Sequence, residues 1–452
     1  MNNYSREIGV AKAGLVGFCK KICAGLKRPE AKLMTNVMYG IAASESCKLT
    51  EIGRALEEEI PLKKTVNRLS LGLMKFSGNA VLWENYLKRA EKYVDDTTIF
   101  PIDESDAAKP YGVAMEAIHP VHDGSTGGTV PGYSTLEIVA LAHGTKTPLP
   151  VYERVFSAAE TDFVSQPQEV FDGLRFLSKR FGHGGFRVLD RGYDANPYMK
   201  YFIDNKERFI IRVRKNRVVR HNGQSVNIED LAARYKGKYA YTCTLNGEQY
   251  HLKVAEIPIN IYEFGDYQLH LVVVYGFGKK PMLLLTNCRG DAMCTAIAKM
   301  YQLRWKIEEQ FGFKKQQYAF EDFRVRTLCA IRALHTLVTL LTGYFALLSQ
   351  QPDTLTFCIL RRAARAIPRS KKRKPKRFFH YELATGLAFL LRKTSANLKA
   401  LFPTKTYHSP SPQLSLLSLP ATFRFPTSRS FCLMPGFWGN SRQKTIAFRK
   451  CT

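Results

Sequence analysis

The spacing of apolar residues changes along the chain, and residues 1–95 are predicted to be helical. Apolar positions follow helical spacing in Leu49–Leu56, where Thr50 can act as a cap. Pro61 interrupts the pattern, and the basic stretch Leu62–Leu69 follows. A helix, a short break and a basic helix are typical of a helix-turn-helix that contacts DNA, although two packed helices joined by proline produce the same pattern.

From about residue 96 the pattern alternates between strands and helices. The β-branched run Thr97–Ile102 ends at Asp103, and the strand candidate Gly185–Leu189 ends at Asp190. Further candidates are the strands Thr135–Leu141 and Phe209–Val213 and the helix Pro167–Phe181. Strands that alternate with helices predict an α/β sheet over residues 96–213.

Residues 214–285 contain strand candidates without long helices between them. These candidates are Tyr239–Leu245, Tyr250–Ala255, Tyr267–Val274 and Pro281–Leu285. Asn246-Gly247 between the first two is a hairpin signal. We therefore predict a β-rich insertion over 214–285, after which the α/β domain resumes as helices over 286–350.

Several classes of protein do not fit the sequence. Met1–Arg28 lacks the apolar run and cleavage-like site of a signal peptide. Ala333–Leu348 is slightly shorter than the ~18 residues of a membrane span and contains His335, so we predict a buried helix and no membrane partner. The ten cysteines form no C-x2-C pair, and His119 and His122 stand alone, which argues against zinc and disulfides. A cytoplasmic, nucleoid-associated protein is expected.

The formal net charge is +28, which causes self-repulsion unless an acidic partner neutralises it, and nucleic acid is the leading candidate ahead of an anionic membrane surface. Residues 355–452 hold 20 basic residues and one acid. Arg361–Arg377 alone has ten Lys and Arg, so we predict a basic helical region over 351–402 that contacts phosphate. Residues 403–452 are rich in Ser, Pro, Leu and Phe without periodicity. We hypothesise that this tail is degenerate, by read-through or a shifted frame.

One helical segment carries the candidate chemistry. At ~100° per residue, four side chains fall within a sector of ~60°: Tyr301, Arg304, Glu308 and Lys315. Leu303, Ile307 and Phe311 form the adjacent apolar stripe. Glu309 and Lys314 point away from the cluster. The segment can therefore pack on a sheet and present a polar edge to a groove, although an ordinary charged edge with an Arg304–Glu308 pair has the same pattern.

Two aspartates give this edge a chemical meaning. Asp103 and Asp190 each follow an apolar strand candidate, and with Glu308 they provide three carboxylates. Three carboxylates repel one another unless cations lie between them, and oxygen ligands favour Mg²⁺ or Mn²⁺. Two such ions ~3.5–4 Å apart can activate a water or a 3′-hydroxyl and stabilise the leaving oxygen of a phosphodiester. Arg304 and Lys315 would neutralise phosphates beside them.

The chain resembles the DDE transposases of bacterial insertion sequences, in the family named after insertion sequence four. The pattern Y-x2-R-x3-E-x6-K is matched by Tyr301, Arg304, Glu308 and Lys315. Ile102–Asp106 and Leu189–Asp194 are similar to the sequences around the family's two aspartates. The β-rich insertion before the glutamate is a further shared feature. The resemblance covers about residues 45–350.

The resemblance implies a ribonuclease H-like catalytic domain. Asp103, Asp190 and Glu308 would bind the metal ions, and Tyr301, Arg304 and Lys315 would contact transposon-end DNA near the scissile phosphate. Asp106 and Asp194 compete for the two aspartate positions, and we favour Asp103 and Asp190 because each directly ends an apolar run. Trp305 could stack on a displaced base, but a packing role is the favoured interpretation.

The expected function is cut-and-paste DNA transposition. Element ends would be cut by two-metal hydrolysis and their 3′-hydroxyls joined to target DNA by transesterification, in a synaptic complex that contains a homodimer. Two alternatives remain open at this point. One is a metal-dependent nuclease that cuts without joining, and the other is a non-catalytic DNA-binding protein that uses the helix pair and the basic tail.

Overall fold

The computed structural model describes residues 5–394 apart from 125–126, 143–144, 146, 246, 279 and 368–377. The irregular tail over 403–452 and most of the basic run Arg361–Arg377 therefore lie outside the described residues.

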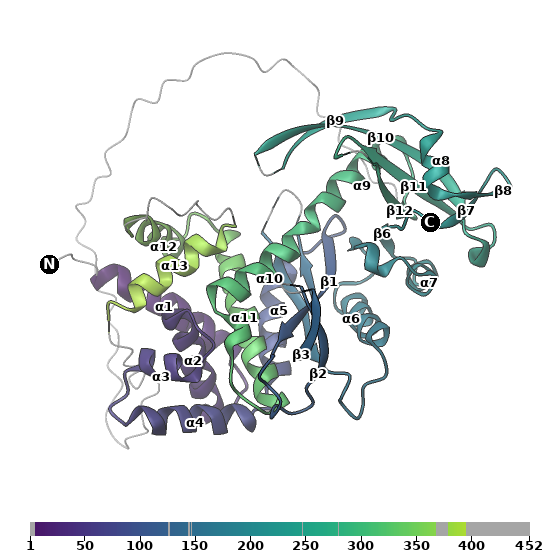
Figure 1. Ribbon diagram of the computed structural model, residues 1–452. Coiled ribbons are helices and arrows are strands. Elements are labelled where there is room, and N and C mark those ends of the chain that lie inside the picture. Colours follow the sequence, from purple (N-terminus) through teal and green to yellow (C-terminus); the bar gives the residue numbers. More distant parts are fainter. Residues whose placement is uncertain are drawn as a thin grey trace, which may run out of the picture. The chain divides into compact units, whose positions relative to one another are not determined.

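The first 90 residues fold into helices (Figure 1). These are α1 (Ser5–Ile22), α2 (Arg28–Ser44), α3 (Leu49–Leu56), α4 (Leu62–Met74) and α5 (Asn79–Ala90). The break between α3 and α4 has two local causes. Glu57 adopts left-handed backbone with φ of 46°, and Pro61 precedes the first residue of α4. A proline is tolerated there because the first N–H groups of a helix have no partner within the helix.

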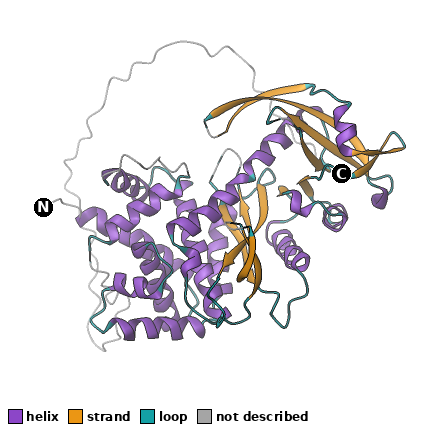
Figure 2. Cartoon of the chain, viewed as in Figure 1, coloured by secondary structure: helices purple, strands orange, loops and turns teal. Residues whose placement is uncertain are grey.

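A mixed sheet follows the helices (Figure 2). Its first strands are β1 (Ile99–Ala108), β2 (His119–Asp123), β3 (Gly128–Ala140), β4 (Leu149–Phe156), β5 (Phe186–Leu189) and β6 (Arg208–Arg212). β3 is antiparallel to β1 and to β4, whereas β1, β5 and β6 are parallel to one another. The predicted α/β character is confirmed at this level.

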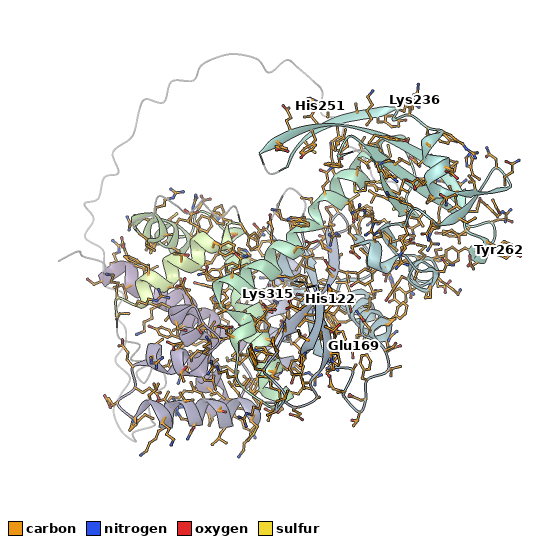
Figure 3. The ribbon with its side chains drawn as sticks, in the orientation of Figure 1. His122, Glu169, Lys236, His251, Tyr262 and Lys315 are labelled. Atoms are coloured by element: carbon orange, nitrogen blue, oxygen red, sulfur yellow. The ribbon has the colours of Figure 1, made fainter. Side chains whose placement is uncertain are left out.

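The same sheet continues into the β-rich part of the chain. Its strands are β7 (Val218–His221), β8 (Gln224–Asn227), β9 (Tyr239–Leu245), β10 (Glu248–Asn260), β11 (Gln268–Tyr275) and β12 (Met282–Thr286). β12 pairs with β6, which joins the two parts. β9 and β10 form the hairpin predicted from Asn246-Gly247, with Leu245 opposite Glu248. Lys236, His251 and Tyr262 mark this part in Figure 3.

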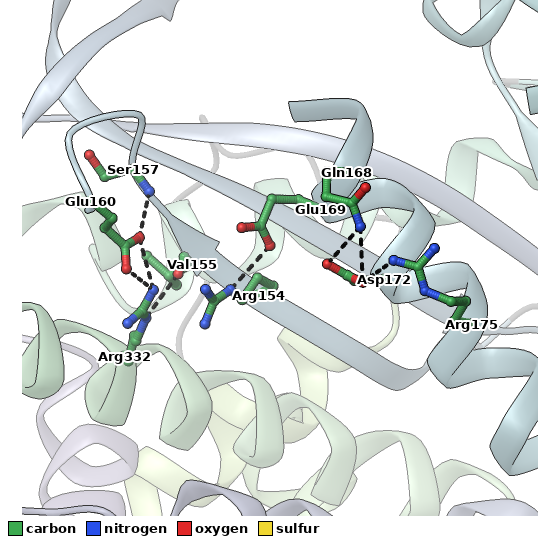
Figure 4. A network of polar contacts seen from close by, with 9 residues as sticks. All are labelled: Arg154, Val155, Ser157, Glu160, Gln168, Glu169, Asp172, Arg175 and Arg332. Carbon is green, nitrogen blue, oxygen red and sulfur yellow. Dashed lines mark hydrogen bonds and ion pairs between the residues drawn. The ribbon is translucent and has the colours of Figure 1, made fainter. Parts of the chain in front are cut away.

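Helices cover both faces of the first part of the sheet. α6 (Gln166–Phe181) buries Val170, Leu174 and Leu177, and Arg154 of β4 pairs with Glu169 of α6 at 3.2 Å (Figure 4). The other face carries α10 (Trp305–Gln317) and α11 (Leu328–Ser349). Because side chains alternate along a strand, Leu136 of β3 lies next to α6 and Glu137 lies under α10.

The remaining helices are α7 (Asn196–Asp204), α8 (Ile228–Ala233), α9 (Asp291–Leu303), α12 (Leu355–Ala366) and α13 (His380–Leu391). Among the described helices, α11 is long and apolar enough to cross a membrane, but 83% of its apolar window is buried inside the fold. The predicted buried helix around Ala333–Leu348 is confirmed.

The prediction that the first strand ends before Asp103 is wrong. β1 continues to Ala108 because its antiparallel partner β3 pairs with it from Ile102 to Ala108. Its parallel partner β5 ends at Leu189, opposite Ile102. Asp103 therefore lies directly after the last residue of β1 that pairs with β5, although β1 itself continues.

Candidate active site

The strand register brings the two predicted aspartates to the same edge. Ile102 of β1 is level with Leu189 of β5, so Asp103 and Asp190 are the next residue on each strand. The Asp190 carboxylate accepts a hydrogen bond from the Gly192 backbone N–H at 2.6 Å and so begins a short 3-10 helix. Both aspartates are thus held by backbone geometry.

The segment from Tyr301 to Lys315 is not one continuous helix. α9 ends at Leu303 and α10 begins at Trp305. The Arg304 N–H bonds to the Tyr301 carbonyl at 3.0 Å, three residues back, and the Arg304 carbonyl accepts from the Ile307 N–H at 3.1 Å. These bonds tighten the chain locally as in a 3-10 turn. The expected uninterrupted helix is therefore corrected to two helices that meet at Arg304.

Arg304 joins two of the predicted acids. Its Nη1 donates to Asp103 Oδ2 at 2.8 Å, and its Nη2 donates to Glu308 Oε1 at 2.5 Å. The guanidinium fork therefore spans a carboxylate on β1 and a carboxylate on α10, which is the geometry that arginine favours.

The carboxylates are close enough to influence one another. Burial raises the pKa of Asp103 most, Arg304 lowers it, and Asp190 and Glu308 each raise it further, with a net pKa of about 6. The pKa of Arg304 is raised despite its burial, chiefly by Asp103, so its positive charge is secure. The structure thus joins Asp103 and Glu308 through Arg304, and it places Asp190 close enough to Asp103 to act on its pKa.

Tyr301 and Lys315 flank this group at different places. Tyr301 is buried beside Arg304, whose guanidinium lies 6.0 Å from the ring centroid, and Asp190 acts on its pKa, which burial raises. Lys315 lies farther along α10 (Figure 3), where its Nζ donates to the Asp106 carbonyl at 2.8 Å and pairs with Glu321 at 2.9 Å.

The competing acids are engaged elsewhere. Asp194 is buried and receives two hydrogen-bonding groups, the Arg217 guanidinium at 2.6 Å and the Arg214 backbone N–H at 2.6 Å. Asp106 accepts from the Ser134 hydroxyl at 2.9 Å, and strand alternation assigns it to the face opposite Asp103. Neither carboxylate points to Glu308.

Two features near the site were not foreseen from the sequence. Glu104, on the opposite face of β1, accepts from Gln166 at 2.8 Å and from the Tyr193 hydroxyl at 3.3 Å, and burial raises its pKa to about 7. Trp305 is 58% exposed, so the packing role favoured from the sequence is wrong. The break at Arg304 accounts for this, because it places Trp305 at the first turn of a new helix.

The donor set fits a hard divalent cation. Asp103, Asp190 and Glu308 offer only carboxylate oxygens, the ligand type that suits Mg²⁺ and Mn²⁺. Among the described residues, the group whose ligand atoms all lie within 4.8 Å of one another is a different one, Glu137, Glu153 and His335. In this group Glu137 already forms an ion pair with Lys314.

Comparisons with known proteins bear on what this site belongs to. No curated protein matches the chain. A cryo-EM structure of a piggyBac transposase synaptic complex with hairpin DNA aligns with 91% of this chain and 87% of that chain, at 10% identity and a TM-score of 0.44. A family model described as the transposase DDE domain matches residues 79–342. This match covers more than half of the chain and every residue of the site described above, and the protein is therefore a member of the DDE-domain transposase family.

Proposed function

We propose that this transposase performs cut-and-paste transposition of an insertion sequence of the family named after insertion sequence four. The observation that carries the proposal is that Arg304 bridges Asp103 of β1 and Glu308 of α10, while Asp190, directly after the parallel strand β5, lies beside Asp103. These residues would hold Mg²⁺ or Mn²⁺, and we propose that two ions bind. Bound metal would supply the activation of water or a 3′-hydroxyl and the stabilisation of the leaving oxygen.

The chain's own residues orient the DNA. Arg304 is held by two acids that metal ions would neutralise, so its guanidinium becomes available to a phosphate next to the scissile bond. The Tyr301 ring lies beside the Arg304 guanidinium, and Lys315 provides a second cation farther along α10. We assign all three to contacts with the element ends.

The organisation of the whole chain is part of the proposal. We infer a ribonuclease H-like catalytic domain over 96–213 and 286–350, with the β-rich insertion over 214–285 between its two parts. Three antiparallel strands, β4, β3 and β1, followed by the parallel strands β5 and β6, support this. The N-terminal region over 1–95 would bind DNA, with Lys63 and Lys64 exposed on α4. A homodimer would hold two element ends in the cytoplasm.

The decisive experiment combines cleavage and joining. The protein is incubated with terminal inverted-repeat DNA and Mg²⁺, and Asp103→Ala and Glu308→Ala are expected to abolish both reactions. Glu309→Ala is the matched control, because Glu309 is adjacent on α10 but pairs with Lys306 at 2.6 Å. If the first two variants cut as well as the wild type, the proposal is wrong. Pre-cut ends test joining alone, and a protein that cuts but never joins them is a nuclease.

A further inference from the structure

Four carboxylates lie in one row across neighbouring strands of the sheet. In order across the sheet they are Asp190 directly after β5, Asp103 on β1, Glu137 on β3 and Glu153 on β4. Glu137 is the register partner of Asp103 on one side and of Glu153 on the other. Like charges directly opposite each other on a sheet destabilise it, so this row needs cations. We call Glu137 and Glu153 the back pair.

The back pair is neutralised by the chain itself. The Lys314 ammonium forms an ion pair with Glu137 Oε1 and donates to Thr339 at 3.0 Å, and Gln310 donates to Glu137 Oε2 at 2.8 Å. His335 of α11 pairs with Glu153 at 2.7 Å. Burial raises the pKa of Glu153, but His335, Lys314 and Thr339 together outweigh this effect, and the net pKa is lowered. Lys314 and His335 therefore occupy the positions beside these acids where a metal ion would otherwise bind.

These contacts fix the rotation of α10. Gln310 and Lys314 lie roughly 200° and 240° around the helix from Glu308, on the side that faces the sheet. On the side of α10 that faces the sheet, the apolar contacts are few, since Ile307 and Phe311 form a separate cluster with Val139, whereas Phe313 packs against α11 and α13. Apolar contacts of this kind set the distance between α10 and the sheet. The buried Lys314–Glu137 ion pair also sets the orientation of the helix, because its atoms must meet.

We propose that Glu137, Gln310 and Lys314 are positioning residues for the active site. Glu137 is the register partner of Asp103 on the neighbouring strand. The contacts of Gln310 and Lys314 with Glu137, which hold α10 to the sheet, therefore also set the distance from Glu308 to Asp103. Rotation of α10 that separates Glu308 from Asp103 must break the Lys314–Glu137 pair. The effect on metal binding rests on the proposed function, whereas the contacts that hold α10 to Glu137 do not.

The test removes both charges together, so that no unpaired charge is left buried. In Glu137→Gln/Lys314→Met, hydrogen exchange of the amides of residues 305–317 is expected to rise ~10-fold. The affinity for Mn²⁺, titrated without DNA, is expected to fall ~10-fold, the loss typical when residues that support metal ligands are changed. Gln310→Met keeps the ion pair and is the milder variant, expected to shift both readouts in the same direction by less.

A matched pair of substitutions separates positioning from general stability. Arg332 of α11 pairs with Glu160 at 2.6 Å and bonds to the Val155 carbonyl (Figure 4), without joining α10 to the sheet. Arg332→Met/Glu160→Gln is expected to lower the melting temperature but to leave α10 exchange and Mn²⁺ affinity unchanged.

Equal values of both readouts in the two double variants would overturn the positioning role. Failure of the proposed function has a different signature: wild type and Glu308→Gln would then bind Mn²⁺ alike, while the α10 exchange result would stand.

Discussion

Two groups of carboxylates that lie next to each other in the fold have similar composition and opposite surroundings: the three acids of the candidate active site, which we call the front half, and the back pair, which we call the back half. In the front half, Asp103 and Glu308 share Arg304, and their side chains are 17% and 32% exposed. In the back half, Glu137 and Glu153 pair with Lys314 and His335, and no side chain among these four is more than 3% exposed. In the front half, Arg304 joins a strand carboxylate to a helix carboxylate, whereas in the back half Lys314 and His335 of two covering helices each pair with a strand carboxylate.

The difference shows that a cluster of acids does not identify a metal site by itself. A buried ion pair is costly to break, because each separated charge lacks both water and a partner. A pair at the rim is weaker, since water screens it and can replace either partner. Under the proposed function, metal ions and DNA phosphate would replace the Arg304 pairs in the front half, whereas the buried pairs of the back half would stay intact. Exposure to solvent is therefore the observation by which we propose a catalytic role for the front half and a structural role for the back half.

The largest effect is expected at the front half, and comparing the two aspartates that follow β5 tests it, because only Asp190 belongs to that half. Asp190→Asn should lower the rate of DNA cleavage by at least about 1,000-fold, equivalent to roughly 4 kcal/mol of transition-state stabilisation. Its melting temperature should change little. Asp194→Asn should instead lower the melting temperature, because Arg217 loses its buried partner. Cleavage assays and thermal unfolding of both variants check this, and the reverse result would exchange the roles of the two acids.

The next effect is expected at the back half. Lys314→Met leaves Glu137 buried without its ammonium partner, and should reduce the free energy of unfolding by about 3–5 kcal/mol. Adding Glu137→Gln removes the stranded charge and should restore most of that loss. Urea unfolding of the single and double variants measures both values. A double variant that is as unstable as the single one would show that packing, and not charge, holds this position.

The front half could be predicted from the sequence because its signals are local. Asp103 and Asp190 each follow an apolar run, and helical spacing alone relates Arg304 to Glu308. Even there, the length of β1 and the break at Arg304 were missed. The pairing of β1 with β3 extends the strand past the point where its own apolar pattern stops.

The back half could not be predicted, because it depends on strand register. Glu137 stands inside a strand candidate that was recognised, and Lys314 was correctly placed outside the Tyr301–Glu308 cluster. Nothing in the spacing within either segment says that these two side chains meet, since 177 positions separate them. A buried charge inside an apolar strand is the one signal available, and it indicates that a partner exists without naming it.

A third surface of α10 gives a smaller, pH-dependent effect. His380 of α13 packs against Phe313, and neither ring nitrogen has a hydrogen-bond partner among the described residues. Burial lowers the pKa of His380 from 6.5 to about 3. The unfolded chain binds this proton near pH 6.5, so stability is lost as the pH falls below that value.

Between pH 7 and pH 5 the loss should be about 2 kcal/mol in the wild type. His380→Phe should lack this component, and urea unfolding of both proteins at the two pH values measures the difference. An equal loss in the variant would place the titrating group elsewhere.

The smallest effect returns to the front half and has the opposite sign. The pKa of Asp103 is raised from 3.8 to about 6, so the native state holds this proton more tightly than the unfolded chain. Its contribution to stability is present below pH 3.8 and is lost as the pH rises through 6. Without metal at pH 7.5, Asp103→Asn should therefore raise the free energy of unfolding, by an amount on the order of 1 kcal/mol after allowance for the lost Arg304 pair. At pH 4 the gain should vanish, because the wild-type carboxyl is then protonated.

Added Mn²⁺ should stabilise the wild type and not the variant, since only the wild type retains the charged ligand. A variant that is less stable than the wild type at pH 7.5 without metal would mean that Arg304 already satisfies Asp103, and that the front half is as closed as the back half.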